Sequence, residues 1–286
     1  MITVAVDAGG ADLGAAEVAA GAAIAARAGI GVILFGPAAQ TGPVSAGVEV
    51  VDAPISIAKS AEPAYAVRAT PEASIVQAAR AVADGRAQAL VSGGSTGSAL
   101  AAALFNIRRD RGIHRPALAL PLPVPGGSPV LLLDVGANLN CRPEHMVQFA
   151  HMGSAFAHAV LGIEAPRVAL LSNGEEAVKG TPDLIEVHEQ LSGVAGTGLR
   201  FIGNIEGTRL FEDAVDVVVT DGFTGNIALK LIEGVSGRTM RAIRDAALRT
   251  QRGRLGGWLL APTVRALRTQ IDPETPGGAY MLGLRQ

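Results

Sequence analysis

The sequence predicts an α/β fold built on a doubly wound, mostly parallel sheet. Short apolar runs alternate with helical patterns over most of the chain, which is typical of strands joined by crossover helices. The runs are bounded by glycine, proline and polar residues, which indicates buried strands. The sequence contains no internal repeat and no low-complexity linker, so we expect a single domain over residues 1–286.

The expected elements follow one another in regular order. The first strand covers residues 2–6 and ends in Asp7. Further strands are expected at 32–35, 48–51, 89–91, 118–120, 130–133, 168–171, 201–202 and 215–220. Helices are expected at 13–28, 71–83, 99–108, 144–160 and 182–191. Pro71 and Pro182 begin two of these helices, where a proline N–H is not needed.

The pattern changes after Asn226. Residues 227–250 predict one long helix, and apolar residues at helical spacing up to Ile271 predict a second. Residues 252–260 lie between them, with basic flanks and the only tryptophan. We therefore expect a helical hairpin over about residues 227–272. Its apolar tip would consist of Leu255, Trp258, Leu259 and Leu260.

Composition excludes several classes of protein. A formal net charge of −2 over 286 residues gives no reason to expect nucleic acid as a partner. A single cysteine excludes an internal disulfide and fits a reducing, cytoplasmic setting. No secretory signal precedes the first strand, and no apolar run approaches the roughly 20 residues of a membrane span.

Residues 130–148 form the strongest candidate for an active site. The apolar run 130–133 is followed by a loop that contains Asp134, Gly136, Asn138, Cys141 and His145. In parallel α/β sheets, ligands bind at the carboxyl ends of the strands, where such loops begin. A carboxylate, an amide, a thiol and an imidazole within twelve residues of one loop therefore indicate a functional site.

Two of these side chains have alternative roles. Cys141 would be a nucleophile if His145 or the helix start lowered the pKa of its thiol. A lone cysteine near a helix start is more often a small packing residue, and we favour that interpretation. His145 is a candidate general acid or base, or a hydrogen-bond donor to a substrate oxygen.

Three further loops that follow strands suit an anion. In the loop 92–98, the N–H groups of Gly94, Ser95, Thr96 and Gly97 would form an anion cradle, or the glycines would only permit a tight turn. The second loop, which is an anion site or an ordinary capped turn, contains Asp221, Gly222, Thr224, Gly225, Asn226 and Lys230. In the third loop, with Asn173, Lys179 would bind an anion or pair with Glu175 or Glu176.

Three aspartates, Asp7, Asp134 and Asp221, each end a predicted strand, and we expect them at the same sheet edge. Clustered carboxylates bind Mg²⁺ or cap loops by accepting backbone N–H bonds. We favour capping, because bare carboxylates would repel an anionic ligand. Residues 9–14 do not match the dinucleotide-binding fingerprint, so a nucleotide site is poorly supported.

Together and in this order, the loops resemble the bacterial phosphate acyltransferase family, the acyl-ACP:phosphate acyltransferases of phospholipid synthesis. The strongest match is LLLDVGANLNCRPEHMVQFAHMGS at 131–154. The other matches are SGGSTGSALAAALF at 92–105, HRPALALPLP at 114–123, NGEEAVKG at 173–180, FIGNIEG at 201–207 and DGFTGNIALK at 221–230. The matches span nearly the whole chain, and their combination is specific although no single loop is.

The resemblance implies a Rossmann-like fold related to the phosphotransacetylases, acting as a homodimer. The implied reaction transfers a fatty acyl group from acyl carrier protein to inorganic phosphate, with no metal or nucleotide cofactor. We expect Asn138, His145 or Lys179 to polarise the thioester carbonyl, and the glycine loops to hold phosphate. The hairpin would contact the dimer mate or the inner face of the cell membrane.

The sequence departs from the family pattern in two places. The loop after the first strand, residues 9–13, lacks the usual methionine, histidine and proline. The family pattern also continues beyond a segment like 277–286 into a further strand and helix. Two alternatives therefore stay open: a phosphotransacetylase-like enzyme that uses acyl-CoA, and a non-catalytic relative that binds carrier protein or membrane.

Overall fold

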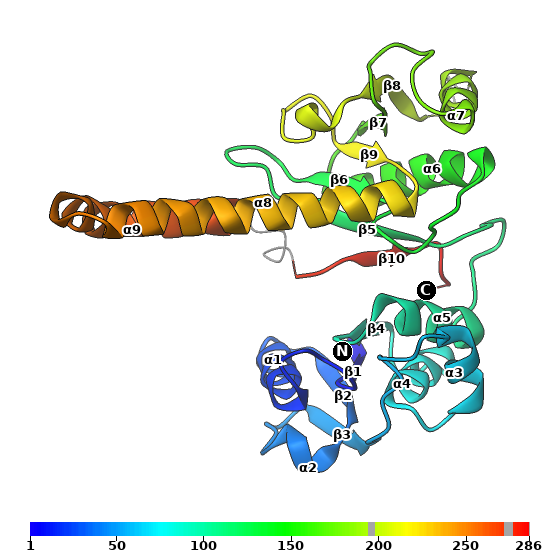
Figure 1. Cartoon of the computed structure of the whole chain (residues 1–286). Coiled ribbons are helices and arrows are strands. Elements are labelled where there is room, and N and C mark those ends of the chain that lie inside the picture. The colour runs from blue at the N-terminus through cyan, green and yellow to red at the C-terminus, as the bar shows by residue number, and fades with distance from the viewer. Residues whose placement is uncertain (194–197, 272–276, 286) are drawn as a thin grey trace. The chain divides into compact units, whose positions relative to one another are not determined.

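The computed structural model describes residues 1–193, 198–271 and 277–285, and its strands form two sheets (Figure 1). Backbone contacts divide the chain into two compact units. Unit 1 is Met1–Gly112 with Leu284 and Arg285, and unit 2 is Ile113–Gly283. Each unit has its own sheet and its own apolar core. The expectation of one domain over residues 1–286 stays a prediction.

Unit 1 contains a four-stranded parallel sheet in the order β3-β2-β1-β4. The strands are β1 (Thr3–Asp7), β2 (Gly31–Gly36), β3 (Val48–Asp52) and β4 (Ala89–Ser92). The helices are α1 (Ala15–Arg27), α2 (Ala38–Thr41), α3 (Pro63–Ala69), α4 (Ser74–Ala83) and α5 (Thr96–Asn106). Ile33 and Phe35 pack with α4 on one face of the sheet, and Leu34 packs with α1 on the other. Helices thus cover both faces, as a parallel sheet requires.

Unit 2 contains a six-stranded sheet in the order β10-β5-β6-β9-β7-β8. The strands are β5 (Ala117–Leu122), β6 (Val130–Leu133), β7 (Arg167–Leu171), β8 (Arg200–Ile205), β9 (Val217–Val219) and β10 (Tyr280–Leu282). Strands β6, β9, β7 and β8 are mutually parallel, whereas β10 and β5 are joined by antiparallel pairing. The predicted mostly parallel α/β fold is confirmed, and its strands are distributed over two sheets.

Helices cover both faces of the sheet in unit 2. They are α6 (Pro143–Ala159), α7 (Pro182–Gly193), α8 (Gly222–Leu248) and α9 (Gln251–Ile271), with a short 3-10 helix at Gly207–Arg209. Phe149 of α6 and Val187 of α7 pack on one face, and Leu229 of α8 packs on the other. Because helices cover both faces, all four residues of β6 are buried apolar residues, which explains why this strand appears as a continuous apolar run.

The predicted helical hairpin is formed by α8 and α9, which extend from the sheet of unit 2 (Figure 1, yellow to orange). Helix α8 begins at Gly222 and not at Ile227, because Asp221 caps it. Helix α9 begins at Gln251, so the turn lies at residues 249–250 and not at 252–260. The four expected tip residues therefore lie on α9: Leu255, Trp258, Leu259 and Leu260. No helix in the described part of the chain is long and apolar enough to cross a membrane.

Candidate active site

The loops that follow the four parallel strands of unit 2 lie along one edge of its sheet. Strands β6, β9, β7 and β8 are neighbours in that order and run in the same direction, so their carboxyl ends share one edge. Strand β6 leads into residues 134–145, β9 into 221–230, and β7 into 173–180. The structure thus brings three of the four predicted loops to the edge where such sheets bind ligands.

Asp134 determines the shape of the loop after β6. Its carboxylate is fully buried, and Oδ1 accepts the backbone N–H groups of Leu118, Gly136 and Ala137 at 3.0, 3.1 and 2.9 Å. Oδ2 accepts the backbone N–H and the side-chain Nδ2–H of Asn138 at 2.7 and 2.8 Å. These donors replace the water that a buried carboxylate loses. The favoured capping role is therefore confirmed for Asp134.

The amide of Asn138 is used to hold the same loop. The residue is only 7% exposed, and its Nδ2 donates to the carbonyl oxygen of Pro116 at 2.7 Å as well as to Asp134. Both partners are acceptors, so they determine which end of the amide is the nitrogen. Because both N–H bonds are occupied, a substrate oxygen would have to displace one. This geometry favours a loop-positioning role for Asn138 over polarisation of a carbonyl.

The first turn of α8 packs directly against this loop. The Gly222 N–H donates to the Asn138 carbonyl oxygen at 2.9 Å. A Cβ at Gly222 would lie 2.6 Å from that oxygen, and a Cβ at Gly225 would overlap the carbonyl oxygen of Asp134. Only glycine permits so close an approach of two backbones. The positive end of the α8 dipole is thereby held beside residues 134–138.

Capping uses most polar groups at the start of α8. The Asp221 carboxylate accepts the backbone N–H of Thr224 at 2.8 Å and its hydroxyl at 2.7 Å. Lys230 forms an ion pair with Glu233 at 2.9 Å. Of the first N–H groups of α8, that of Phe223 has no acceptor among the described residues. This loop therefore offers an anion fewer free donors than its sequence suggests.

Two exposed amides belong to the loops at this edge. Asn226 lies on the first turns of α8, and its Oδ1 is 3.9 Å from the position that a Cβ at Gly136 would take. Asn173 follows β7, with its Oδ1 at 3.5 Å from the hydroxyl of Ser172. Asn226 therefore lies beside the loop after β6, and both amides are accessible to a substrate.

His145 is a neutral hydrogen-bond donor. It lies in the first turn of α6, is 9% exposed, and its Nδ1 accepts the Arg142 N–H at 3.2 Å. This bond places the proton of the neutral ring on Nε2. The pKa of His145 is lowered, and burial is the largest cause. The negative charge of Glu144 acts to raise this pKa, whereas the positive charge of Arg115 lowers it further. The geometry therefore favours donation from Nε2–H over action as a base.

Cys141 has the properties of a packing residue. Its thiol is half-buried, packs against the core around Phe149, and lies 3.6 Å from the Asn138 carbonyl oxygen. Burial raises the pKa of the thiol to about 11. Because the thiolate is the nucleophile, a thiol with this pKa is almost entirely unreactive at neutral pH. The packing interpretation is supported, and the structure gives no support to a covalent role.

Lys179 is an exposed cation in the loop after β7. Among the described residues no carboxylate lies within 4.0 Å of its ammonium, and Glu175 pairs instead with Arg209 at 2.7 Å. The aliphatic part of the Lys179 side chain lies beside Gly174. The expected alternative of an ion pair with Glu175 or Glu176 is therefore not observed. The ammonium is available to an anionic or partly negative substrate oxygen.

Sequence reasoning missed three residues that hold this loop. The buried Asn204 is hydrogen-bonded to the half-buried His188 at 2.9 Å, and Asn204 also donates to the Glu176 carbonyl oxygen at 2.9 Å. Arg209 binds both Glu175 and Glu212. The available signal was a polar asparagine at the end of an otherwise apolar strand, in the segment FIGNIEG.

In unit 1, the loop 92–98 connects β4 to α5. Ser95 caps α5 by accepting the Ser98 N–H at 3.4 Å. The N–H groups of Ser95, Thr96 and Gly97 have no acceptor among the residues that the structure describes, and the Gly94 N–H is bonded within the loop. Consecutive open N–H groups at a helix start suit an anion, as predicted for this loop. The loop belongs to unit 1.

The prediction that Asp7 shares a sheet edge with Asp134 and Asp221 is wrong. Asp7 ends β1 in the sheet of unit 1, whereas β6 and β9 belong to the sheet of unit 2. Its buried carboxylate accepts the Gly9 N–H at 2.9 Å and the Ser92 hydroxyl at 2.7 Å, and burial raises its pKa. Asp7 therefore also holds loops. Over residues 1–193, 198–271 and 277–285, no cluster of His, Cys, Asp and Glu could hold a metal ion.

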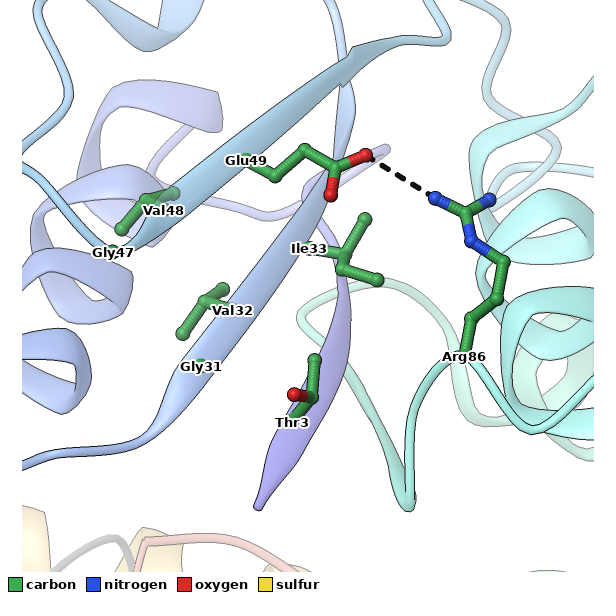
Figure 2. A pocket seen from close by; sticks show the side chains of 8 residues that line it. All are labelled: Thr3, Gly31, Val32, Ile33, Gly47, Val48, Glu49 and Arg86. Atoms are coloured by element: carbon green, nitrogen blue, oxygen red, sulfur yellow. Dashed lines mark hydrogen bonds and ion pairs between the residues drawn. The ribbon is translucent and has the colours of Figure 1, made fainter. Parts of the chain in front are cut away.

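A surface pocket in unit 1 lies at the other ends of its strands. Figure 2 shows its lining: Thr3, Gly31, Val32, Ile33, Gly47, Val48, Glu49 and Arg86. Thr3, Gly31 and Val48 are the first residues of β1, β2 and β3. The charged pair of the pocket, Arg86 and Glu49 at 3.2 Å, is exposed and typical of a surface ion pair. Because parallel sheets bind ligands at their carboxyl ends, we do not assign the active site to this pocket.

The sheets, their crossover helices and the glycine loops define an α/β protein with the fold of the phosphotransacetylases. A phosphotransacetylase from Streptococcus pyogenes matches with a TM-score of 0.61 and 18% identity over 82% of each chain. A branched-chain phosphotransacylase from Enterococcus faecalis matches with a TM-score of 0.56 and 20% identity, over 81% of this chain and 84% of the other. Likeness at these identities concerns the fold alone.

The chain belongs to the fatty acid synthesis protein family, whose model matches residues 2–286. A relative from Pelotomaculum thermopropionicum, named phosphate acyltransferase, is 42% identical over 288 residues, which cover 98% of this chain and 83% of the relative. A relative of the same name from Levilactobacillus brevis is 40% identical over 291 residues, which cover 99% of this chain and 84% of the relative. The resemblance read from the loops is thus confirmed.

Proposed function

We propose that this chain is an acyltransferase that moves a fatty acyl group from acyl carrier protein to inorganic phosphate, giving acyl phosphate for phospholipid synthesis. Family membership and the names of the relatives support acyl transfer to phosphate. The structural observation that supports it is the alignment of the loops after β6, β9 and β7 along one sheet edge. Lys179, which has no carboxylate partner among the described residues, and a neutral histidine donor belong to those loops.

The proposed reaction does not require the protein to form a covalent bond with the substrate. A phosphate oxygen attacks the carbonyl carbon of the thioester, and the carbon–sulfur bond breaks. The sulfur leaves with the bonding electrons and takes up a proton, which its ordinary pKa of about 8.5 makes easy. The protein then needs to orient the reactants and to stabilise the negative charge that develops on the carbonyl oxygen.

We assign the catalytic role to polar groups that have no hydrogen-bond or ion-pair partner among the described residues. The Nε2–H of His145 and the ammonium of Lys179 would donate to the carbonyl oxygen. Residues that hold the loops in place would be Asn138, Asp134, Cys141, Asp221, Gly222, Thr224 and Gly225. Residues that line the substrate would be Gly136, Asn173, Asn226 and Lys230. In unit 1, the N–H groups of the loop formed by Gly94, Ser95, Thr96 and Gly97 would bind an anion such as phosphate.

The test is acyl phosphate formation from long-chain acyl–acyl carrier protein and phosphate, trapped with hydroxylamine. We expect phosphate-dependent product, and a fall in kcat/KM of about 10²–10³-fold for Lys179→Met and His145→Ala, the range for removal of an oxyanion donor. Asn138→Ala should also slow turnover by disturbing the loop. Arg27→Met, which removes an exposed cation on α1, serves as the control and should leave turnover unchanged.

Three outcomes would contradict the proposal in different ways. Near-normal rates in all three variants would exclude these residues as the catalytic groups. A preference for acyl-CoA over the carrier protein would support the phosphotransacetylase-like alternative. No product from folded protein that still binds acyl carrier protein would support the non-catalytic alternative.

We also propose that the chain acts as a homodimer in the cytoplasm with peripheral contact to a membrane, through the α8–α9 hairpin. Leu255, Trp258, Leu259 and Leu260 are 61, 73, 63 and 58% exposed on α9. Exposed apolar side chains beside arginines suit a membrane interface.

A further inference from the structure

Strand β8 contains one residue more than the segment of β7 with which it pairs. Val168 of β7 lies opposite Phe201 of β8. Leu170 comes two residues after Val168, but it lies opposite Asn204, which comes three residues after Phe201. The extra residue forms a bulge, and Gly203 within it has a φ of 101°. Glycine adopts this backbone conformation without the steric cost that a side chain would bring.

The bulge determines where Asn204 points. In a regular strand, residues three apart lie on opposite faces of the sheet. Here both Phe201 and Asn204 contact His188 of α7, which packs on one face. The rings of Phe201 and His188 are 5.3 Å apart and nearly perpendicular, and Asn204 Oδ1 lies 2.9 Å from His188 Nδ1. The bulge has thus turned Asn204 to the face covered by α7.

The Asn204 amide is buried and fully directed by its partners. It is 5% exposed, and its Nδ2 donates to the carbonyl oxygen of Glu176 at 2.9 Å. Because a carbonyl only accepts, Nδ2 must face Glu176, so Oδ1 faces His188 and His188 Nδ1 carries the proton. The Glu176 carbonyl therefore determines the orientation of the amide, and the amide determines the tautomer of His188.

The Glu176 carbonyl oxygen links this buried amide to Lys179. The same oxygen accepts the backbone N–H of Lys179 at 3.0 Å, which closes the turn 176–179. Lys179 itself is exposed, as is the ion pair of Arg209 with Glu175 that also contacts this loop. Exposed ion pairs contribute little, so the hydrogen bond from the buried Asn204 amide is the main constraint on the turn.

We infer that Asn204 is a positioning residue for Lys179, and that the bulge at Gly203 exists to aim it. Without the Nδ2 donor, the turn 176–179 loses its buried anchor, and the ammonium of Lys179 is no longer held at the sheet edge. Displacement by about 1 Å of a group that orients or polarises a substrate costs up to about 100-fold in rate. The inference rests on the proposed function, in which Lys179 contacts the substrate.

The variant Asn204→Asp tests the inference. It keeps an acceptor for His188 but replaces the donor to the Glu176 carbonyl oxygen with a carboxylate oxygen. In the acyl phosphate assay we expect kcat to fall about 10-fold and KM for acyl carrier protein to stay within about 2-fold. In a Lys179→Met background, the same change should cost less than about 2-fold, because residues that act through one another are not additive.

Two further measurements separate positioning from general damage to the fold. Asn106→Asp makes the same chemical change at a half-buried amide on α5, whose Nδ2 donates to the Ala102 carbonyl oxygen at 2.7 Å. It should leave kcat unchanged. Hydrogen exchange of the peptide covering residues 173–180 should be faster in Asn204→Asp than in the wild type. This readout does not depend on turnover.

The outcomes distinguish the inference from the proposed function. If the wild type makes no acyl phosphate, the proposed function fails, and the exchange of residues 173–180 alone decides whether Asn204 anchors the loop. With an active wild type, an equal loss of kcat in the Lys179→Met background would overturn the inference. Unchanged exchange in Asn204→Asp would also overturn it.

Discussion

The two buried carboxylates Asp134 and Asp216 of unit 2 are surrounded by different kinds of hydrogen-bond donor. Asp134 accepts N–H groups of its own loop and the N–H of Leu118 in the neighbouring strand β5. Asp216 is 7% exposed and is neutralised by Arg167, 49 residues away in the sequence. Arg167 begins β7, and Asp216 immediately precedes β9. A side-chain pair therefore joins the amino ends of two neighbouring strands.

Replacement of Asp216 should destabilise the fold. Arg167 donates to Asp216 from Nε at 2.9 Å, from Nη2 at 2.9 Å and from its backbone N–H at 2.7 Å. Asp216→Asn removes the charge and leaves donors unpaired, so the free energy of unfolding at pH 7 should fall by about 2 kcal/mol. Asp213→Asn, at the 85% exposed partner of Arg167, should change it by less than about 0.5 kcal/mol. Urea unfolding measures both.

The same pair should make stability depend on pH in the acid range. Burial acts to raise the pKa of Asp216, but the hydrogen bonds and charge of Arg167 outweigh it, and the pKa is lowered overall. The stabilisation is therefore complete above the unfolded value of about 3.9 and is lost as pH falls through the lower folded value. The difference between wild type and Asp216→Asn should narrow below about pH 4. A constant difference down to pH 2 would contradict this account.

At the scale of elements, the glycines of α8 have opposite physical roles. Gly225 lies where the first turn meets the carbonyl oxygen of Asp134, and a Cβ there has no room. Gly234 lies in the middle of the same helix, and nothing is within 4 Å of a Cβ placed on it. One glycine permits packing, and the other only weakens the helix.

Alanine substitutions should therefore change stability in opposite directions. Gly225→Ala should lower the free energy of unfolding by about 1–3 kcal/mol through overpacking against backbone. It should also reduce turnover, because α8 and the loop 134–138 must separate. Gly234→Ala should raise the free energy of unfolding by up to about 1 kcal/mol. If thermal or urea unfolding showed the same shift for both, packing at Gly225 would not explain its presence.

Element boundaries were predictable where the signal was local. Proline at the first turn marks the starts of α6 and α7, and both begin close to the predicted positions. The start of α9 was predicted too late, because the apolar residues at helical spacing were followed only from residue 260 onward. Gly257 lets α9 approach α8: a Cβ there would lie 3.2 Å from the Cβ of Ala247. Packing against another helix overrode the local preference for a turn.

For the molecule as a whole, the hairpin carries a long series of exposed apolar side chains. On α8 it includes Leu231 and Val235, and on α9 it includes Leu255, Trp258 and Leu259, each more than half exposed. Apolar side chains in such numbers along one element are typical of an interaction surface. A membrane surface and a second copy of the chain are the two occupants proposed above.

Trp258 reports on this surface directly, because it is the only tryptophan in the chain. We expect its fluorescence to shift to the blue, and to be quenched by brominated lipid, when anionic vesicles are added. Trp258→Glu should reduce vesicle co-sedimentation several-fold, whereas Tyr65→Glu, at a 69% exposed aromatic residue of α3, should not. A blue shift that depends on protein concentration without vesicles would indicate a dimer contact instead.

The sequence alone was enough to predict the strands β1 to β9, the polar loops that follow them and the family, but not the edge strand β10. These features are local: an apolar run of four residues such as 130–133 followed by Asp134 indicates a buried strand that ends in a loop, whatever lies beside it. The combination of several such loops was specific enough to identify the family.

The pairing of the strands, and which polar groups keep a free donor or acceptor, became clear from the three-dimensional structure. Asp7 lies in a different sheet from Asp134, Asn138 has no N–H left to offer, and a bulge in β8 turns Asn204 towards the loop of Lys179. Each of these facts depends on a partner distant in the sequence. Strand pairing and burial depend on residues distant in the sequence. They determine whether a side chain of suitable chemistry has a polar group free to contact a substrate.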